Sequence, residues 1–131
     1  MVISNGVDII SVERVRAIIS RSGDRFLSRW FNPEEIRYCT SRVRPAEHFS
    51  ARIAAKEAAI KALRVPWQGG ILLKDICVSH DPSGAPRLVL GGEALRVARQ
   101  RGIAEMHLSL SHCADYAVAS VVAVRAPSAE P

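Results

Sequence analysis

The chain has 131 residues, which fits a single domain, and its hydrophobic and charged fractions of 48% and 24% are typical of a globular protein. No apolar run approaches the roughly 20 residues of a membrane span, and the first ten residues lack the features of a signal peptide, so we expect a cytoplasmic protein without a membrane partner. The net charge is +5, and nine of the fifteen arginines lie between Arg14 and Arg52, which indicates either an anionic partner or a generally solubilising surface.

The first half of the chain predicts one strand and three helices. Asn32 precedes Pro33 and two glutamates, a pattern typical of a helix start because Asn caps free N–H groups and proline suits the first turn. The third helix is the longest and is rich in alanine, a strong helix former. We expect a strand over residues 2–12 and helices over residues 12–21, from 33 to before Pro45, and over 46–63.

The second half predicts a loop, two hairpins and one helix. Residues 81–84 have the composition of a tight turn, and residues 106–111 alternate apolar and polar side chains as a half-buried strand does. Strands joined mostly by hairpins indicate an α+β fold with mostly antiparallel strands around a long central helix. We expect one domain over residues 1–125, with residues 126–131 as a disordered tail. The expected elements are a loop over 66–70, strands over 71–80, 86–90, 106–111 and 116–124, and a helix over 92–101.

The long helix carries charges among apolar neighbours. Large apolar residues and alanines surround nearly its whole circumference, so we expect two buried faces. Buried charges are costly unless they are paired or bind a ligand. Glu57 and Lys61 are spaced for a local ion pair, but Glu57 could instead meet a cation with Asp8 as second carboxylate, while the lysines meet phosphates. The residues alone leave both interpretations open, and Asp8 could equally be a strand-end residue.

Other reactive side chains give weaker signals. The neighbours Ser111 and His112 do not predict a nucleophilic serine, because adjacent strand residues point to opposite faces and no GxSxG motif surrounds the serine. Cys39, Cys77 and Cys113 have no CxxC spacing, so we expect neither a disulfide framework nor a zinc site. We expect all three cysteines to be small, buried or half-buried hydrophobic side chains.

Three segments together resemble one family. They are GVDI at residues 6–9, FSARIAAKEAAIKAL at 49–63, and LSLSH at 108–112 followed by DYAVA at 115–119. Their order and spacing are similar to those of holo-(acyl-carrier-protein) synthase, the small single-domain 4'-phosphopantetheinyl transferase. The resemblance implies Mg²⁺-dependent transfer of the 4'-phosphopantetheine group from coenzyme A to a serine of an apo acyl carrier protein, releasing adenosine 3',5'-bisphosphate. It also implies a homotrimer with active sites between subunits.

The resemblance further implies roles for individual residues. One subunit supplies Asp8, Glu57 and Lys61, and the next supplies the segment Ser111-His112. Asp8 and Glu57 hold Mg²⁺, which commonly binds carboxylates together with phosphates and waters. Lys61 contacts the pyrophosphate, and either Glu57 or an ion-bound water that it orients takes the serine proton. The other implied contacts with coenzyme A are Arg52 and His112 at the 3'-phosphate with Arg44 as a further candidate, Gly84 to Pro86 along the adenine, and Lys56 as either a phosphate contact or a structural pair.

The resemblance also implies a docking surface for the carrier protein, with a cationic character that suits an acidic helical partner. Its arginines and Ile18 share one helix face only if the helix continues past Gly23. The sequence does not indicate whether the carrier serves fatty-acid or secondary-metabolite synthesis. The docking residues are Arg14, Ile18, Arg21, Arg25 and Phe26.

Two other functions remain to be weighed against the transferase. A nucleic-acid-binding domain is compatible with the basic first half, but the aromatic content is only 5% and no RNP-like or KH-like motif is present, so we expect no nucleic-acid partner. A non-catalytic scaffold that binds coenzyme A is the second alternative. The presence of Asp8, Glu57 and Lys61 argues against it.

Overall fold

A computed structural model describes residues 1–66 and 71–127 of the chain. It contains two antiparallel sheets, one of three strands in the order β1-β5-β4 and one formed by β2 and β3. The α+β class with antiparallel sheets is therefore confirmed. The elements are β1 (Val2–Ser11), α1 (Val12–Trp30), α2 (Pro33–Thr40), α3 (Pro45–Leu63), a 3-10 helix η1 (Leu73–Asp75), β2 (Ile76–His80), β3 (Pro86–Leu90), α4 (Gly92–Gln100), β4 (Ile103–His112) and β5 (Tyr116–Arg125).

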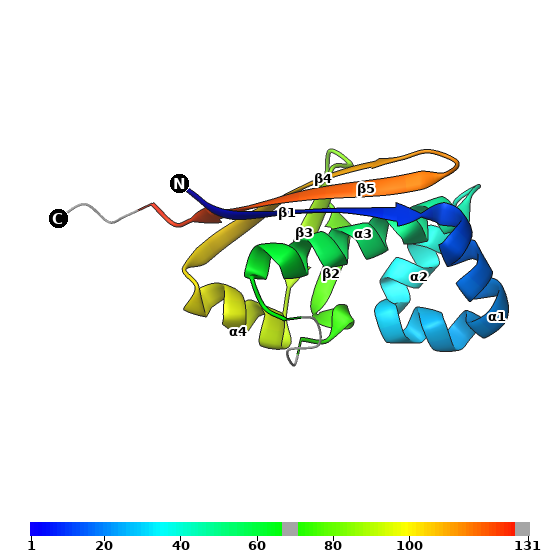
Figure 1. The fold of residues 1–131 in the computed structure, drawn as a ribbon, viewed down its shortest axis with the longest axis horizontal. Coiled ribbons are helices and arrows are strands. Elements are labelled where there is room, and N and C mark those ends of the chain that lie inside the picture. The colour runs from blue at the N-terminus through cyan, green and yellow to red at the C-terminus, as the bar shows by residue number, and fades with distance from the viewer. Residues whose placement is uncertain (67–70, 128–131) are drawn as a thin grey trace.

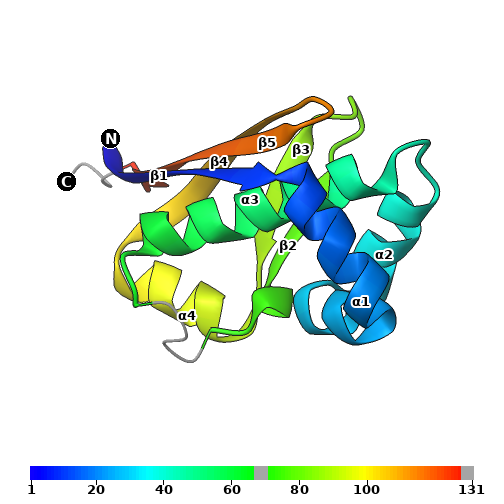
Figure 2. The same ribbon diagram turned by 45° about the vertical axis from the view of Figure 1, so that its right-hand side comes forward.

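Helix α3 lies along one face of the three-stranded sheet, with α1 and α2 at one end of the molecule and α4 at the other (Figure 1). The view in Figure 2 shows the same helix passing between the sheet and the remaining helices. Six alanines of α3 are fully or almost fully buried, and the helix has no polar face, so the expectation of two buried faces is confirmed. Small side chains let neighbouring backbones approach α3 closely, which fixes the strand beside it.

The close approach is tightest where β1 crosses α3. A Cβ atom added to Gly6 would lie 2.0 Å from the carbonyl oxygen of Ala58, so only glycine fits there. Two residues earlier, the Ser4 hydroxyl donates a hydrogen bond of 2.6 Å to the carbonyl oxygen of Ala62. These contacts fix the position of β1 along the axis of α3. They therefore also fix the position of Asp8, the next inward-facing residue of β1.

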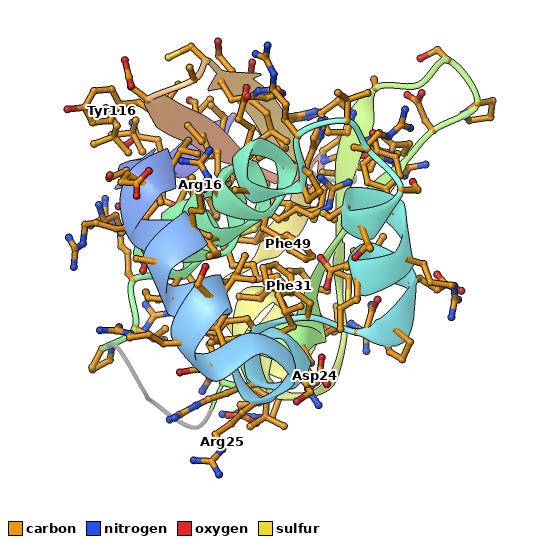
Figure 3. All side chains as sticks on the ribbon, turned by 90° about the vertical axis from the view of Figure 1, so that its right-hand side faces the viewer. Arg16, Asp24, Arg25, Phe31, Phe49 and Tyr116 are labelled. Carbon is orange, nitrogen blue, oxygen red and sulfur yellow. The ribbon has the colours of Figure 1, made fainter. Side chains whose placement is uncertain are left out.

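A second core joins α1 and α2 to α3. The rings of Phe31 and Phe49 are in contact, with centroids 5.1 Å apart and planes tilted by 53°, between the helices in Figure 3. Val15, Cys39 and Ile53 complete the buried part of this cluster. The first half of α1 and the start of α3 are thereby held together near one end of the sheet.

The helix start at Asn32 forms as predicted. The Asn32 side chain accepts from the Glu35 amide at 2.8 Å, and Glu35 accepts from the Asn32 amide at 3.2 Å. In contrast, α1 does not end near Gly23 but continues to Trp30 across a non-helical turn, with φ 30° and ψ −112° at Gly23. Apolar residues beyond Gly23 pack on the second core, and this packing stabilises the rest of α1 although glycine favours a helix end.

Two further expectations differ from the structure. The expected strand over 71–80 is a 3-10 helix followed by β2, which begins only at Ile76. Cys113 is exposed in the turn after β4, so its expected burial is wrong, whereas Cys39 is buried and Cys77 half-buried. Burial raises the pKa of Cys39 to about 11. Most of the predicted loop and tail, at residues 67–70 and 128–131, lies outside the described residues.

The three-stranded sheet has one face on the core and one exposed face. In β4, Leu108 and Leu110 are half-buried while Ser109 and Ser111 are exposed, so the predicted alternation is confirmed. Along β1 the outward residues include Val7 and Ile9, with 60% and 63% of their surface exposed. Within residues 1–66 and 71–127, no helix is both long and apolar enough to cross a bilayer.

Candidate active site

Asp8, Glu57 and Lys61 converge where β1 crosses α3. Asp8 lies opposite Ala119 of β5, a buried residue, which turns its side chain toward the helix. The ammonium of Lys61 donates to the carbonyl oxygen of Val7 at 2.8 Å and to Asp8 Oδ1 at 3.1 Å. The ion pair of Lys61 is thus made with Asp8, rather than with Glu57 one turn earlier on its own helix.

The positive charge near the two carboxyl groups of this site is too small for both of them to ionise easily. Burial, followed by a hydrogen bond and charge repulsion from the neighbouring Asp8, raises the pKa of Glu57 to about 8, although Lys61 and Arg14 act in the opposite direction. Asp8 Oδ2 is buried and has no hydrogen-bond partner within residues 1–66 and 71–127. An orphaned carboxylate oxygen beside a second carboxyl group is the environment that a hard divalent cation stabilises.

The donor set also limits which cation fits. The described part of the chain contains no group of three or more His, Cys, Asp or Glu side chains placed to hold a metal ion. Two carboxylates without nitrogen or sulfur donors suit Mg²⁺, which keeps waters and takes substrate phosphates as further ligands. Asp8 and Glu57 therefore fit a magnesium ion whose other ligands would be waters and phosphate oxygens.

A second polar site lies at the far edge of the sheet and is called the basic cluster below. The guanidinium carbons of Arg42 and Arg52 both lie 4.3 Å from the centre of the Tyr38 ring. The His80 ring lies 4.6 Å and the His48 ring 6.1 Å from the same ring. The His48 and His112 rings are 5.0 Å apart. The basic cluster consists of Arg42, His48, Arg52, His80 and His112 around Tyr38.

One buried acid borders the basic cluster. Glu47 accepts from His112 Nδ1 at 3.0 Å and lies 3.6 Å from the Arg44 guanidinium, so it joins two residues that the resemblance assigns to coenzyme A. The hydrogen bond from His112 is the main cause that lowers the pKa of Glu47. Arg52 is only 2% exposed, and its Nε atom has no hydrogen-bond partner in the described structure. This buried cation is consequently available to an anion.

Lys56 belongs to neither site. Its side chain is completely buried and donates to Glu35 Oε1 and to the carbonyl oxygen of Leu73, each at 3.0 Å. The other oxygen of Glu35 accepts from the Val78 amide at 3.1 Å. This geometry favours the structural pair over the phosphate contact, because no part of Lys56 reaches the surface.

Three comparisons with known proteins bear on these sites. The sequence profile of the 4'-phosphopantetheinyl transferase superfamily matches residues 4–121. The chain belongs to this superfamily. It is 47% identical over 122 residues to holo-[acyl-carrier-protein] synthase of Koribacter versatilis, a match that covers 93% of this chain and 98% of that protein. Its sequence thus places it among enzymes of the holo-[acyl-carrier-protein] synthase type.

Solved structures of the same transferase type have the same fold. The crystal structure of holo-[acyl-carrier-protein] synthase from Neisseria meningitidis superimposes with a TM-score of 0.85 at 32% identity, covering 95% of this chain and all of that chain. The Helicobacter pylori enzyme in complex with coenzyme A superimposes with a TM-score of 0.80 at 32% identity, covering 92% of this chain and 99% of that chain. A relative with this fold therefore binds coenzyme A.

The remaining residues expected to contact coenzyme A in a transferase of this type lie apart within one chain. Gly84 has φ 89°, a conformation that favours glycine, in the turn between β2 and β3, and Pro86 begins β3. Ser111 is exposed and pairs with Val118 in the sheet, whereas the neighbouring His112 turns toward Glu47. The structure thus joins His112, but not Ser111, to the basic cluster.

The expected docking surface of the transferase is divided by the turn at Gly23. Arg14, Arg21 and Arg25 are exposed while Ile18 and Phe26 are half-buried, but the non-helical turn prevents one continuous helix face. Ile18, Arg25 and Phe26 meet instead along an apolar groove of about 820 Å³ between α1 and η1. Arg25 lies just after the turn at Gly23 and points away from the body of the protein in Figure 3.

Sequence reasoning missed Glu35, Tyr38, Glu47, His48 and His80. Each lies beside a residue that was predicted to be functional, but the contacts join residues up to 65 positions apart in the chain. The available signal was the excess of cationic residues on α3. It indicates that acids or aromatic rings from other segments pack against these cations, but it does not indicate which segments.

Proposed function

We propose that this chain transfers the 4'-phosphopantetheine group from coenzyme A to a serine of an apo acyl carrier protein, with Mg²⁺ as cofactor and adenosine 3',5'-bisphosphate as product. The observation that carries the proposal is the convergence of Asp8, Glu57 and Lys61 with a buried, unpartnered carboxylate oxygen. Membership in the transferase superfamily and a relative solved with coenzyme A support the substrate.

Each residue of this site has a separate part in the proposed reaction. Asp8 and Glu57 hold the metal ion, and Lys61, oriented by Val7 and Asp8, binds the diphosphate of coenzyme A. When bound, the ion supplies positive charge next to the phosphate oxygens on which negative charge develops. Lys61 stabilises the same oxygens during attack by the carrier serine on the β-phosphate.

The serine proton has two possible acceptors in this proposal. Glu57 can accept it directly, because a metal ion bound beside it would keep its carboxylate ionised and therefore able to act as a general base. A water that Glu57 orients is the second acceptor. Either way the proton leaves the hydroxyl as the new phosphodiester bond forms, and adenosine 3',5'-bisphosphate departs.

The basic cluster is the proposed site for the 3'-phosphate. Arg52 supplies a buried guanidinium and His112 an imidazole, with Arg44 beside Glu47 as a further contact. The turn from Gly84 to Pro86 lies at the end of the neighbouring β2–β3 hairpin, where the adenine is proposed to rest.

We further propose that three copies of the chain assemble, with each active site shared by two subunits. In one chain Asp8 lies on β1 and His112 on β4, the two edge strands of the sheet, with β5 between them. A subunit that presents its β4 edge to the β1 edge of the next would join these groups. The exposed side chains of Val7 and Ile9 give the sheet an apolar outer face that association would cover.

The carrier protein is proposed to dock on α1. Arg14 and Arg21 are exposed on its first half, and Arg25 borders the apolar groove that Ile18 and Phe26 line. A cationic surface with apolar contacts complements an acidic helical partner and speeds encounter. A cytoplasmic location stays a prediction.

The test is transfer itself. The full chain is incubated with coenzyme A, Mg²⁺ and an apo carrier, and the carrier is weighed by mass spectrometry. We expect Glu57→Gln to abolish transfer while the fold and assembly persist. Glu105→Gln, at an exposed position of β4, is the matched control and should transfer at the normal rate. Full activity in Glu57→Gln refutes the assignment, and salt-sensitive RNA binding without any transfer favours a nucleic-acid-binding domain.

A further inference from the structure

The basic cluster contains more positive charge than its neighbouring acids can balance. Glu47 is already engaged by His112 and Arg44. Asp81, the acid next to His80, accepts hydrogen bonds from Ser83 and Ala85 within its own turn.

Neither Arg42 nor Arg52 makes an ion pair within residues 1–66 and 71–127, although both stack on Tyr38. A buried guanidinium without an anion is unfavourable, so an anion of high charge is the ligand that completes this site.

Two imidazoles without an assigned role face these guanidiniums. His48, half-buried on α3, faces Arg42, Arg52, His112 and Glu47, and burial followed by the three basic groups lowers its pKa below the usual value. His80, on β2, faces Arg42, Arg52 and Asp81, and burial followed by the two arginines lowers its pKa in the same direction. Both rings are therefore neutral at pH 7 while no anion is bound, and a bound dianion would reverse the balance of charge around them.

We propose that His48 and His80 are additional ligands of a phosphate monoester in the basic cluster and that they take up protons as it binds. The inference rests on the proposed function, in which this monoester is the 3'-phosphate of coenzyme A. Protonated imidazoles donate charge-assisted hydrogen bonds, which are about twice as strong as those of neutral donors. The affinity of the basic cluster for the phosphate monoester is thus highest when both histidines are protonated.

The direction of the pH dependence follows from these charges. The pKa of each histidine is lowered in the free protein, and binding of the dianion raises it, so the added affinity is present at low pH and is lost as pH rises through the pKa of the complex. Protonation of the phosphate itself opposes this effect near pH 6, where its second pKa lies. The useful window therefore begins at about pH 6.5 and extends upward.

The experiment compares coenzyme A with 3'-dephospho-coenzyme A by titration calorimetry on the full chain at constant Mg²⁺. We expect the preference for coenzyme A to fall by roughly tenfold between about pH 6.5 and 8.5, as one titrating proton allows. Calorimetry in two buffers of different ionisation enthalpy should show net proton uptake with coenzyme A and less with the dephospho compound.

Variants assign the effect to residues. His48→Gln and His80→Gln should each reduce the preference for coenzyme A at pH 6.5 by roughly 3- to 10-fold, and together they should flatten its pH dependence. His107→Gln is the matched control, because His107 is an exposed residue of β4 that faces Glu105. Thermal unfolding checks that each variant is folded, and the wild-type pH dependence tests the proposal independently of any variant.

The outcomes separate this inference from the proposed function. A preference for coenzyme A that does not change with pH, or that survives unchanged in the double variant, overturns the role of His48 and His80 whatever the transfer assay gives. Loss of transfer together with an intact, pH-dependent preference overturns the proposed reaction and leaves the phosphate site standing.

Discussion

The buried pair of Glu35 and Lys56 gives a sharp prediction because its two members are not equally replaceable. Glu35→Gln removes the negative charge that pairs with the fully buried ammonium, which then has only neutral acceptors, the carbonyl oxygen of Leu73 and the new amide oxygen, besides the Phe31 ring, whose centre is 5.2 Å away. We expect this change to lower the free energy of unfolding by about 3–5 kcal/mol, the usual cost of stranding a buried charge.

Lys56→Met should be milder than Glu35→Gln. After this change the Glu35 carboxylate keeps the amide donors of Asn32 at 3.2 Å and of Val78 at 3.1 Å. We expect a loss of about 1–3 kcal/mol, since two of its hydrogen bonds persist and methionine fills most of the lysine volume. The double variant strands no charge, so its cost should be less than the sum of the two single changes.

Urea unfolding at pH 7, followed by circular dichroism, measures all four proteins. Protein concentration is held constant because the proposed association would contribute to apparent stability. If both single variants cost less than about 1 kcal/mol, or if their effects are additive, the pair of Glu35 and Lys56 does not hold α2, η1 and α3 together as the structure implies.

Three other perturbations test the remaining parts of the site. Gly6→Ala should displace β1 from α3, because the new methyl group meets the Ala58 carbonyl oxygen; the expected result is a loss of transfer of at least tenfold, and unchanged kinetics would contradict the close approach. Mg²⁺ affinity, measured by calorimetry without coenzyme A, should rise with pH up to about 8 as Glu57 loses its proton, whereas an affinity that is constant from pH 6 to 8 would argue against Glu57 as a ligand. Arg14→Glu should raise KM for the carrier by about tenfold and leave binding of coenzyme A unchanged; an equal loss of both would place the docking surface elsewhere.

The long central helix and the carboxylate site were predictable because their signals are local or unusual. The high alanine content predicts a helix buried on two faces. Charged residues within such a helix need partners or a ligand, so Glu57 and Lys61 could be predicted as site residues. Asp8 could be predicted as the second carboxylate because it is an isolated acid in an apolar strand. The sequence pattern did not predict the partner of Lys61, because Lys61 forms its ion pair with Asp8 and not with Glu57, one turn earlier on the same helix.

The features that were missed depend on contacts between distant segments. Gly23 is a reasonable helix terminator, yet α1 continues because Phe26 and Leu27 pack on the second core. Glu35 is visible in the sequence as a helix-capping residue, but its second partner, Lys56, lies 21 residues away. No local periodicity encodes such pairings.

The basic cluster was missed for a similar reason. Its members come from α2, the segment that follows α2, α3, β2 and β4, so they become neighbours only when the helices and both sheets have packed. Histidines scattered along a sequence carry no spacing signal of their own.

Consecutive residues of β1 serve two different purposes. Asp8 turns inward to the proposed metal site, while Val7 and Ile9, on either side of it, present large apolar side chains to the outside. Because side chains alternate along a strand, a slip of one position against β5 would bury the valine or isoleucine and expel the acid at the same time. The proposed chemistry and the proposed assembly therefore both depend on one strand register, so a change in that register would alter both together.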